Sequence, residues 1–218
     1  MPNWLAWQVV DSAFPVGVFA HSWGLEAAWH AGHVSDAAAL QQFLGGAVQQ
    51  TGYGALPLLV GAYRDPEQWP ALDELADAFL VNTVANRASR VQGRTLAATA
   101  ARIWPSAAMR AIQARTEGGR AHVAPLSGLV FRAIGLSCDT ANAVTLFGTA
   151  RGVLSAAVRL GIVGSYQAQQ LQHEVGPYLD TILARCRKLR PADVCQTAPI
   201  LDLLQAGHDR LYSRLFQS

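Results

Sequence analysis

The sequence contains few charged residues and almost no excess of either sign. Charged residues make up 15% of the 218 positions, whereas soluble domains usually contain about 25%. Seventeen Lys and Arg stand against fifteen Asp and Glu, which leaves a net charge of +2. This balance excludes the broad basic surface with which proteins bind nucleic acids or anionic membranes. Because apolar residues reach 51%, the chain either buries an unusually large share of itself or leaves apolar surface for protein partners.

Cysteine is scarce as well. The three cysteines, Cys138, Cys186 and Cys195, form no CxxC pair, so neither a disulfide framework nor a structural zinc site is indicated. Residues 1–10 lack the basic start and the cleavage site of a secretory signal, and we therefore expect a cytoplasmic protein. The longest uncharged stretch, 37–63, contains four Gln, five Gly and one Pro. This composition favours buried helices with a break between them over a membrane span.

The motifs of common enzymes are also missing. The sequence has no Gly-x-Ser-x-Gly nucleophile motif and no Gly-rich or Walker-type phosphate loop. Pro177 stands where the second histidine of a zinc-binding His-Glu-x-x-His motif starting at His173 would be. We therefore expect a protein that is not an enzyme, with no catalytic residues and no tightly bound cofactor.

The residues that are abundant favour helices. Ala and Leu dominate, and no stretch alternates polar and apolar residues with a period of two. Gly and Pro clusters separate the helical stretches, and neither a linker nor an internal repeat divides the chain. The sequence thus predicts an all-α fold, a single-domain helical bundle of about nine or ten helices over residues 1–218.

One spacing is compatible with a metal site. Glu26, His30 and His33 fall at i, i+4 and i+7, so they would share one face of a continuous helix, although Gly32 between the two histidines can end the helix before His33. A catalytic metal centre in a helical bundle would need further ligands from another helix, and no second Glu-x-x-His spacing occurs. Two interpretations are open at this point. The residues could belong to a helical metal-dependent enzyme, or they could form a surface of mixed polarity without a metal.

Two segments are more specific in sequence than a core alone requires. The first, 11–26, is DSAFPVGVFAHSWGLE, in which Pro and Gly predict a turn before a helix that carries Glu26 in its first turn. The second, 86–94, is NRASRVQGR, in which Arg87, Arg90 and Arg94 at i, i+3 and i+7 form a stripe on one helix. Such a stripe is either a solvated face or, because Arg is enriched at interfaces, a binding surface.

These segments resemble the UreF family of urease accessory proteins, whose pattern D-S-x-F-P-x-G-x-[FY]-x-H-S-x-G-L-E is matched by residues 11–26. The NRASRVQGR stretch, HVAPLSG at 122–128 and RLG at 159–161 match further on, in the family's order. The ending GHDRLYSRLFQS at 207–218 is similar to the family's H-E-x-L-Y-S-R-L-F-x-S terminus. The resemblance therefore extends over nearly the whole chain.

The resemblance implies a function that composition does not show. Members of this family are helical dimers that bridge the accessory protein UreD, also called UreH, to the GTPase UreG. They regulate GTP-dependent nickel insertion into apo-urease, and the nickel is handled by the complex. The resemblance therefore implies a homodimer with UreD/UreH-type, UreG-type and apo-urease partners. No nucleic-acid partner, no membrane partner and no metal-ligating residue is predicted. A UreF-like scaffold for another GTPase is the alternative.

The same resemblance, together with the arginine stripe, gives the residues that we expect to contact partners or a second copy. They are Phe19, His21, Ser22, Gly24, Leu25, Glu26, Arg87, Arg90, Arg94, His208, Arg214, Leu215 and Phe216. In the tail, Arg214 would donate to carbonyls of a partner and Phe216 would be a buried anchor. The alternative is a terminal helix that docks on its own core.

Overall fold

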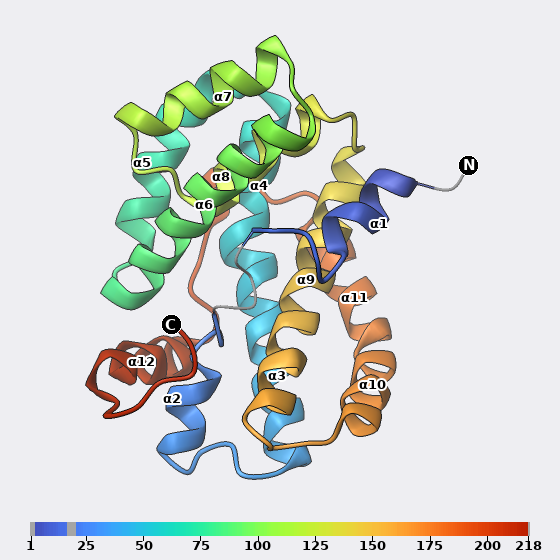
Figure 1. Cartoon of the computed structure of the whole chain (residues 1–218), viewed down its shortest axis with the longest axis vertical. Coiled ribbons are helices and arrows are strands. Elements are labelled where there is room, and N and C mark those ends of the chain that lie inside the picture. The colour runs from blue at the N-terminus through green and yellow to red at the C-terminus, as the bar shows by residue number, and fades with distance from the viewer. Residues whose placement is uncertain (1–2, 17–20, 218) are drawn as a thin grey trace.

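Every regular element of the computed structural model is helical in the residues that it describes, 3–16 and 21–217 (Figure 1). The α-helices are α1 (Trp4–Val10), α2 (Leu25–His30), α3 (Ala37–Gln50), α4 (Leu56–Arg64), α5 (Trp69–Phe79), α6 (Thr83–Ile103), α7 (Ala107–Gly118), α8 (Val123–Ala133), α9 (Cys138–Arg159), α10 (Ser165–Glu174), α11 (Gly176–Cys186) and α12 (Pro199–Ala206). A π turn, η2 (Thr51–Ala55), and the 3-10 turns η3 (Pro66–Gln68) and η4 (Pro191–Asp193) lie between them, and the 3-10 turn η5 (Gly207–Arg210) follows α12. The predicted all-α fold is confirmed.

Polar side chains fix where several helices begin. Asp36 accepts a hydrogen bond from the Ala39 amide at 2.9 Å at the start of α3, and Asn82 accepts one from Val84 at the start of α6. Ser106 caps α7 in the same way. Each side chain satisfies an amide that has no partner within its own helix, which is why these boundaries coincide with Asp, Asn and Ser.

The uncharged stretch 37–63 forms α3, η2 and α4. The predicted break between two buried helices is a π turn rather than a loop. Thr51 in this turn donates its hydroxyl to the Ala47 carbonyl and lies 3.1 Å from the hydroxyl of Thr149 on α9. In the described part of the chain, no helix combines the length and the hydropathy that a membrane crossing needs.

Helices α4 and α8 pack unusually closely. A Cβ atom at Gly128 of α8 would collide with the Leu59 carbonyl oxygen and would lie 2.9 Å from the Tyr63 nitrogen, both on α4. The absence of a side chain at Gly128 therefore lets two helix backbones touch. Helix α6 packs on the same α8 and forms a hairpin with α7, and α9 contacts α3, α10, α11 and α1.

The buried apolar side chains form one connected cluster that runs from Phe14 near the N-terminus to Phe216 near the C-terminus. Helix α12 and the C-terminal tail, which we define as residues 211–217, lie beside α2 at one end of the molecule (Figure 1). The two segments that carry most of the predicted contact residues thus come together in space.

Candidate functional site

A buried carboxylate joins the N-terminal motif to the C-terminal tail. Glu26 on α2 is only 1% exposed. Its carboxylate accepts hydrogen bonds from His208 Nε2 at 2.9 Å and from the backbone amides of Leu215 at 2.6 Å and Phe216 at 3.2 Å. We call these four residues the Glu26 clasp.

The clasp satisfies a group that would otherwise be costly to bury. An isolated carboxylate loses its hydration on burial, and only several good donors offset that loss. Glu26 receives three donors, and its own amide donates to the Ser22 hydroxyl at 3.3 Å. It also lies in the first turn of α2, where the helix dipole favours a negative charge. The cost of burial is therefore met only when the tail is in place.

A close backbone contact allows α12 to reach α2. Gly24 has φ +83°, and a Cβ atom there would lie 2.9 Å from Cβ of Gln205 on α12. A side chain would be strained at this φ and would also push α12 away. Gly24 therefore helps to bring His208, which follows α12, to within hydrogen-bond distance of Glu26.

An arginine on α9 holds the end of the tail. Phe216 is buried, and the guanidinium carbon of Arg159 lies 4.2 Å from the centre of its ring, a cation–π contact. Arg159 Nη2 also donates to the Leu215 carbonyl at 3.5 Å. In this chain Phe216 therefore docks on its own core, the alternative left open by the sequence, and the tail has no helix after η5.

An ion-pair cluster lies on the exposed side of the clasp. Asp209 accepts two hydrogen bonds from Arg87, at 2.8 and 3.1 Å, and one from Arg214 at 3.3 Å. The hydrogen bond from Arg87, followed by the charges of Arg87 and Arg214, lowers the pKa of Asp209 below its usual value. Arg87 thereby ties α6 to the tail, although the exposure of these side chains limits what each pair contributes.

The structure brings most of the predicted contact residues together. The residues at or next to the clasp are His21, Ser22, Gly24, Leu25, Glu26, Arg87, His208, Arg214, Leu215 and Phe216. Arg90 and Arg94 lie further along α6, and Phe19 lies outside the described residues. The buried members, among them Glu26 and His208, position the tail instead of presenting surface.

Sequence reasoning missed several residues of this site. Arg159 was part of the family resemblance but was not predicted to contact the tail. Ile200 and Leu203 on α12 are 70% and 74% exposed, and Tyr212 in the tail is fully exposed. The run of apolar residues in α12 was the available signal: only Asp202 and Gln205 are polar, and a short helix with so wide an apolar face must leave part of that face uncovered.

The metal-site alternative does not have the geometry that it needs. Helix α2 ends at His30, and Gly32 with φ +75° turns the chain before His33. Glu26 points to the tail and is occupied by three donors. Among the described residues, no group of three His, Cys, Asp or Glu side chains is close enough to hold a metal ion. Glu26, His30 and His33 therefore do not share one face of a continuous helix, because the helix ends before His33.

A second buried network contains a serine, a histidine and an aspartate. His122 is fully buried; its Nδ1 lies 3.1 Å from the Ser89 hydroxyl and its Nε2 lies 3.1 Å from Asp77. The Ser89 oxygen also accepts the first amide of α8, that of Val123, at 3.2 Å. Burial lowers the pKa of His122 below its usual 6.5, so the ring is neutral at pH 7. These contacts give Ser89, His122 and Asp77 a structural role: they hold the start of α8 against α5 and α6.

Asp73 completes this junction between α5, α6 and α8. Its carboxylate, which is buried, accepts the backbone amides of Arg120, Ala121 and His122 at 2.7 to 2.9 Å. The turn includes Ala121 with φ +63° and passes so close to Gly93 that a Cβ atom there would collide with the Ala121 carbonyl. The family-like stretches at 86–94 and 122–128 therefore meet at a rigid structural contact.

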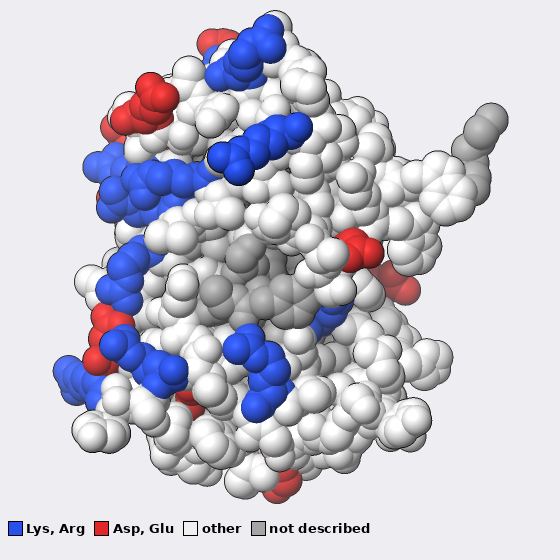
Figure 2. All heavy atoms as spheres, viewed as in Figure 1, with Lys and Arg blue, Asp and Glu red and all other residues white. Residues whose placement is uncertain are grey.

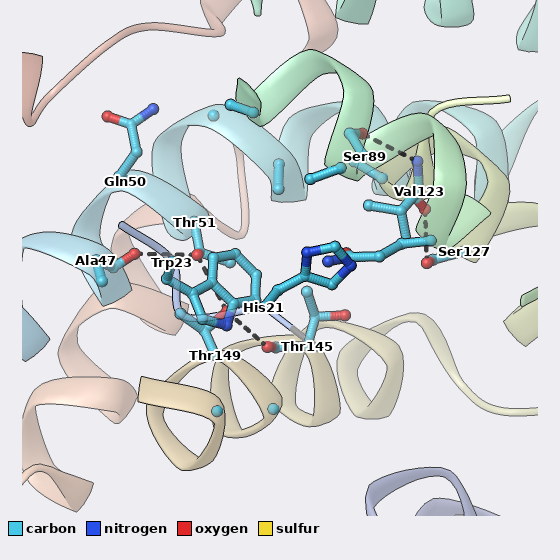
Figure 3. A pocket seen from close by; sticks show the side chains of 18 of the residues that line it. His21, Trp23, Ala47, Gln50, Thr51, Ser89, Val123, Ser127, Thr145 and Thr149 are labelled. Carbon is cyan, nitrogen blue, oxygen red and sulfur yellow. Dashed lines mark hydrogen bonds between the residues drawn. The ribbon is translucent and has the colours of Figure 1, made fainter. Parts of the chain in front are cut away.

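A largely apolar cavity of about 320 Å³ borders the clasp. It is lined by parts of α3, α6, α8 and α9 and by Phe216 of the clasp. Figure 3 shows His21 and Trp23 pointing into it, opposite Ser89 and Ser127. Thr51 and Thr149 are hydrogen-bonded to each other and to backbone carbonyls at its edge (Figure 3). Thr51 and Thr149 therefore already have partners in the chain, whereas the buried Nε1 of Trp23 has no hydrogen-bond partner among the described residues.

His21 makes the stability of this end of the molecule depend on pH. Burial, followed by the charge of His208, lowers the pKa of His21 from 6.5 to about 4. The unfolded chain takes up a proton near pH 6.5 and the folded chain only near 4, so stability falls as the pH drops through this window. From pH 7.5 to pH 5 we expect His21 to account for a loss of about 2 kcal/mol in the free energy of unfolding.

Urea unfolding at the two pH values measures this loss. His21→Gln should lose less stability than the wild type between pH 7.5 and 5, whereas His33→Gln, at an exposed position, should lose as much as the wild type. An equal pH dependence in all three proteins would contradict the role of His21.

The fold and the clasp define an all-α protein whose N-terminal motif and C-terminal tail close on each other around a buried carboxylate. Comparison with known proteins identifies its relatives. The sequence model of the UreF family matches residues 34–176, and the chain belongs to this family.

Named relatives align over almost the whole chain. Urease accessory protein F of Arabidopsis thaliana is 37% identical over 222 residues, which cover 99% of this chain and 92% of that protein. Urease accessory protein F of Oryza sativa subsp. indica is 34% identical, covering 98% and 84%. Urease accessory protein UreF of Mycobacterium sp. (strain JLS) is 30% identical, covering 96% and 96%. The alignment with the Arabidopsis protein leaves out only about 1% of this chain, so it spans both α2 and α12.

Proposed function

We propose that this protein is a scaffold of urease maturation. It bridges a UreD/UreH-type accessory protein and a UreG-type GTPase, and it regulates GTP-dependent nickel insertion into apo-urease. It acts in the cytoplasm as a homodimer, without catalysis or a tightly bound cofactor of its own, and the nickel is cargo of the complex. Membership of a family whose named relatives are urease accessory proteins supports this proposal.

The observation that carries the proposal is a group of exposed apolar side chains at the C-terminal end. Ile200, Leu203, Tyr212 and Leu215 are each at least 60% exposed. Exposed large apolar side chains close to one another mark protein interaction sites. We call these four residues the C-terminal apolar set. In this scheme the clasp fixes the tail, the set makes contact with a partner, and Arg214 supplies hydrogen bonds at its edge.

The clasp gives the buried residues of the predicted site a defined role. Glu26, His208 and Phe216 hold the tail in one conformation, so the ordering entropy of the tail is already lost before a partner binds. A preorganised tail binds more tightly than a loose one that presents the same side chains.

Substitutions in the set test the proposal without opening the clasp. In Tyr212→Ser/Leu215→Ser the backbone amides that bind Glu26 remain, so we expect the fold to be retained. We expect the affinity for the UreD/UreH-type partner to fall at least about 30-fold, which corresponds to about 2 kcal/mol. Calorimetric titration of the purified proteins measures the loss. Truncation after Arg214 is a poorer test, because it also removes two of the three donors to Glu26.

Tyr166→Ser is the matched control, since Tyr166 is 89% exposed but lies on α10. It should bind like the wild type. An unchanged affinity in Tyr212→Ser/Leu215→Ser would contradict the assignment of the apolar set to the interface. Binding to an unrelated GTPase instead of the UreG-type partner would favour a UreF-like scaffold detached from urease.

A further inference from the structure

Helix α6 concentrates the positive charge of the molecule. Its 21 residues contain four arginines and no Asp or Glu. The helix therefore carries +4, whereas the whole chain carries +2, so the other residues are together net negative. Figure 2 shows Lys and Arg side chains gathered over the region of α6, α7 and the C-terminal tail, with few Asp and Glu among them.

The four arginines lie on one side of the helix. With about 100° between successive residues, Arg87, Arg90, Arg94 and Arg102 fall within an arc of about 120°. They extend over about 22 Å along the axis, at 1.5 Å per residue. The opposite side of α6, which includes Leu96 and Ala100, is buried against the core. We call these four residues the arginine stripe.

Only one end of the stripe is neutralised within the described residues. Arg87 pairs with Asp209, whereas no ion pair joins Arg90, Arg94 or Arg102 to a described side chain. Arg94 and Arg102 are exposed, and Arg90 is half-buried, with its Nε atom unpartnered. Like charges in a row repel one another, and a surface of opposite charge removes that cost.

We propose that the arginine stripe docks an acidic surface of a protein partner. The proposal rests on the proposed function, since its occupant is a protein of the assembly. Two features favour a protein over a nucleic acid: the basic surface is a single helix on a chain whose remainder is net negative, and it is continuous with apolar surface. Val91, which is 43% exposed, lies among the arginines, and the Arg87–Asp209 pair links the stripe to the tail.

Charge reversal at the two exposed, unpaired positions tests the inference. Arg94→Glu/Arg102→Glu changes the net charge of the chain from +2 to −2, without touching the clasp. Arg185→Glu/Lys188→Glu makes the same change at exposed positions at the end of α11. The affinity of each variant for the UreD/UreH-type, UreG-type and apo-urease proteins is measured by calorimetry at low and high salt, with circular dichroism as the check of folding.

We expect the stripe variant to bind one of the three proteins at least about tenfold more weakly, and the α11 variant to change less than about twofold. Wild-type affinity for that protein should fall as salt rises, and the variant should show a smaller salt dependence. If the stripe variant and the α11 variant bound all three proteins with equal affinity, this inference would be overturned but the proposed function would not. If wild type bound duplex DNA or RNA and the stripe variant did not, the occupant would be a nucleic acid, which also overturns it. Failure of wild type to bind any of the three proteins would overturn the proposed function together with this inference.

Discussion

Glu26→Ala is expected to release the C-terminal tail and to destabilise the fold by about 3 kcal/mol or more. The substitution removes the carboxylate that accepts three hydrogen bonds. His208 Nε2 and the backbone amides of Leu215 and Phe216 then have no acceptor at this position. Each buried donor that loses its partner costs about 1 to 3 kcal/mol, and the loss of one member of a buried charged network costs about 3 to 5. Part of the loss is recovered because a released tail becomes hydrated.

Two measurements distinguish release of the tail from general weakening. Urea unfolding gives the loss of stability, and hydrogen exchange gives the local opening, which should be fastest at the Leu215 and Phe216 amides. Glu174→Ala is the control, because Glu174 is exposed at the end of α10. A Glu26→Ala protein as stable as this control, with unchanged exchange in the tail, would show that the clasp is not formed in solution.

The second large effect is expected at the contact between α4 and α8. Gly128→Ala places a Cβ atom against the Leu59 carbonyl and the Tyr63 nitrogen, so two backbones must move apart. Backbone cannot turn away as a side chain can, and we expect a loss of about 3 kcal/mol or more in the free energy of unfolding. Ala has a higher helix propensity than Gly, but this offsets only about 1 kcal/mol of the loss.

Gly148→Ala on α9 is the matched control. It is also a Gly within a helix, but a Cβ atom there meets no atom within 4 Å. We expect it to be neutral or to raise stability by about 0.5 to 1 kcal/mol. Thermal and urea unfolding of both variants give the comparison. Similar stabilities of the Gly128→Ala and Gly148→Ala proteins would show that α4 and α8 do not approach each other this closely in solution.

Local signals in the sequence were sufficient for the fold class. The abundance of Ala and Leu and the lack of alternation predicted helices, and the Gly-Tyr-Gly stretch at 52–54 marked the break that is the π turn in the structure. The spacing of Glu26 and His33 gives a shared face only if the helix continues past His30, and Gly32 between the two histidines was the signal in the sequence for its end. The structure has this end, because α2 stops at His30 and Gly32 has a positive φ.

The candidate site was predicted in its parts but not in its assembly. Sequence reasoning selected both Glu26 and the tail, yet the hydrogen bonds that join them connect residues 182 to 190 positions apart. No periodicity links such distant residues; the approach depends on Gly24 and α12, which only the packed structure shows. Arg87, Arg90 and Arg94 of the arginine stripe were found because they are neighbours on one helix, where spacing alone determines the shared face, whereas Arg102, further along α6, was not predicted.

Co-expression with the cognate UreD/UreH-type and UreG-type proteins, followed by molar mass from light scattering, tests the central claim most directly. The scaffold account predicts a stable complex with two copies of each protein, which dissociates when the C-terminal apolar set is substituted. A folded, dimeric protein that binds neither partner would contradict it, because the family fold would then be present without the bridging function.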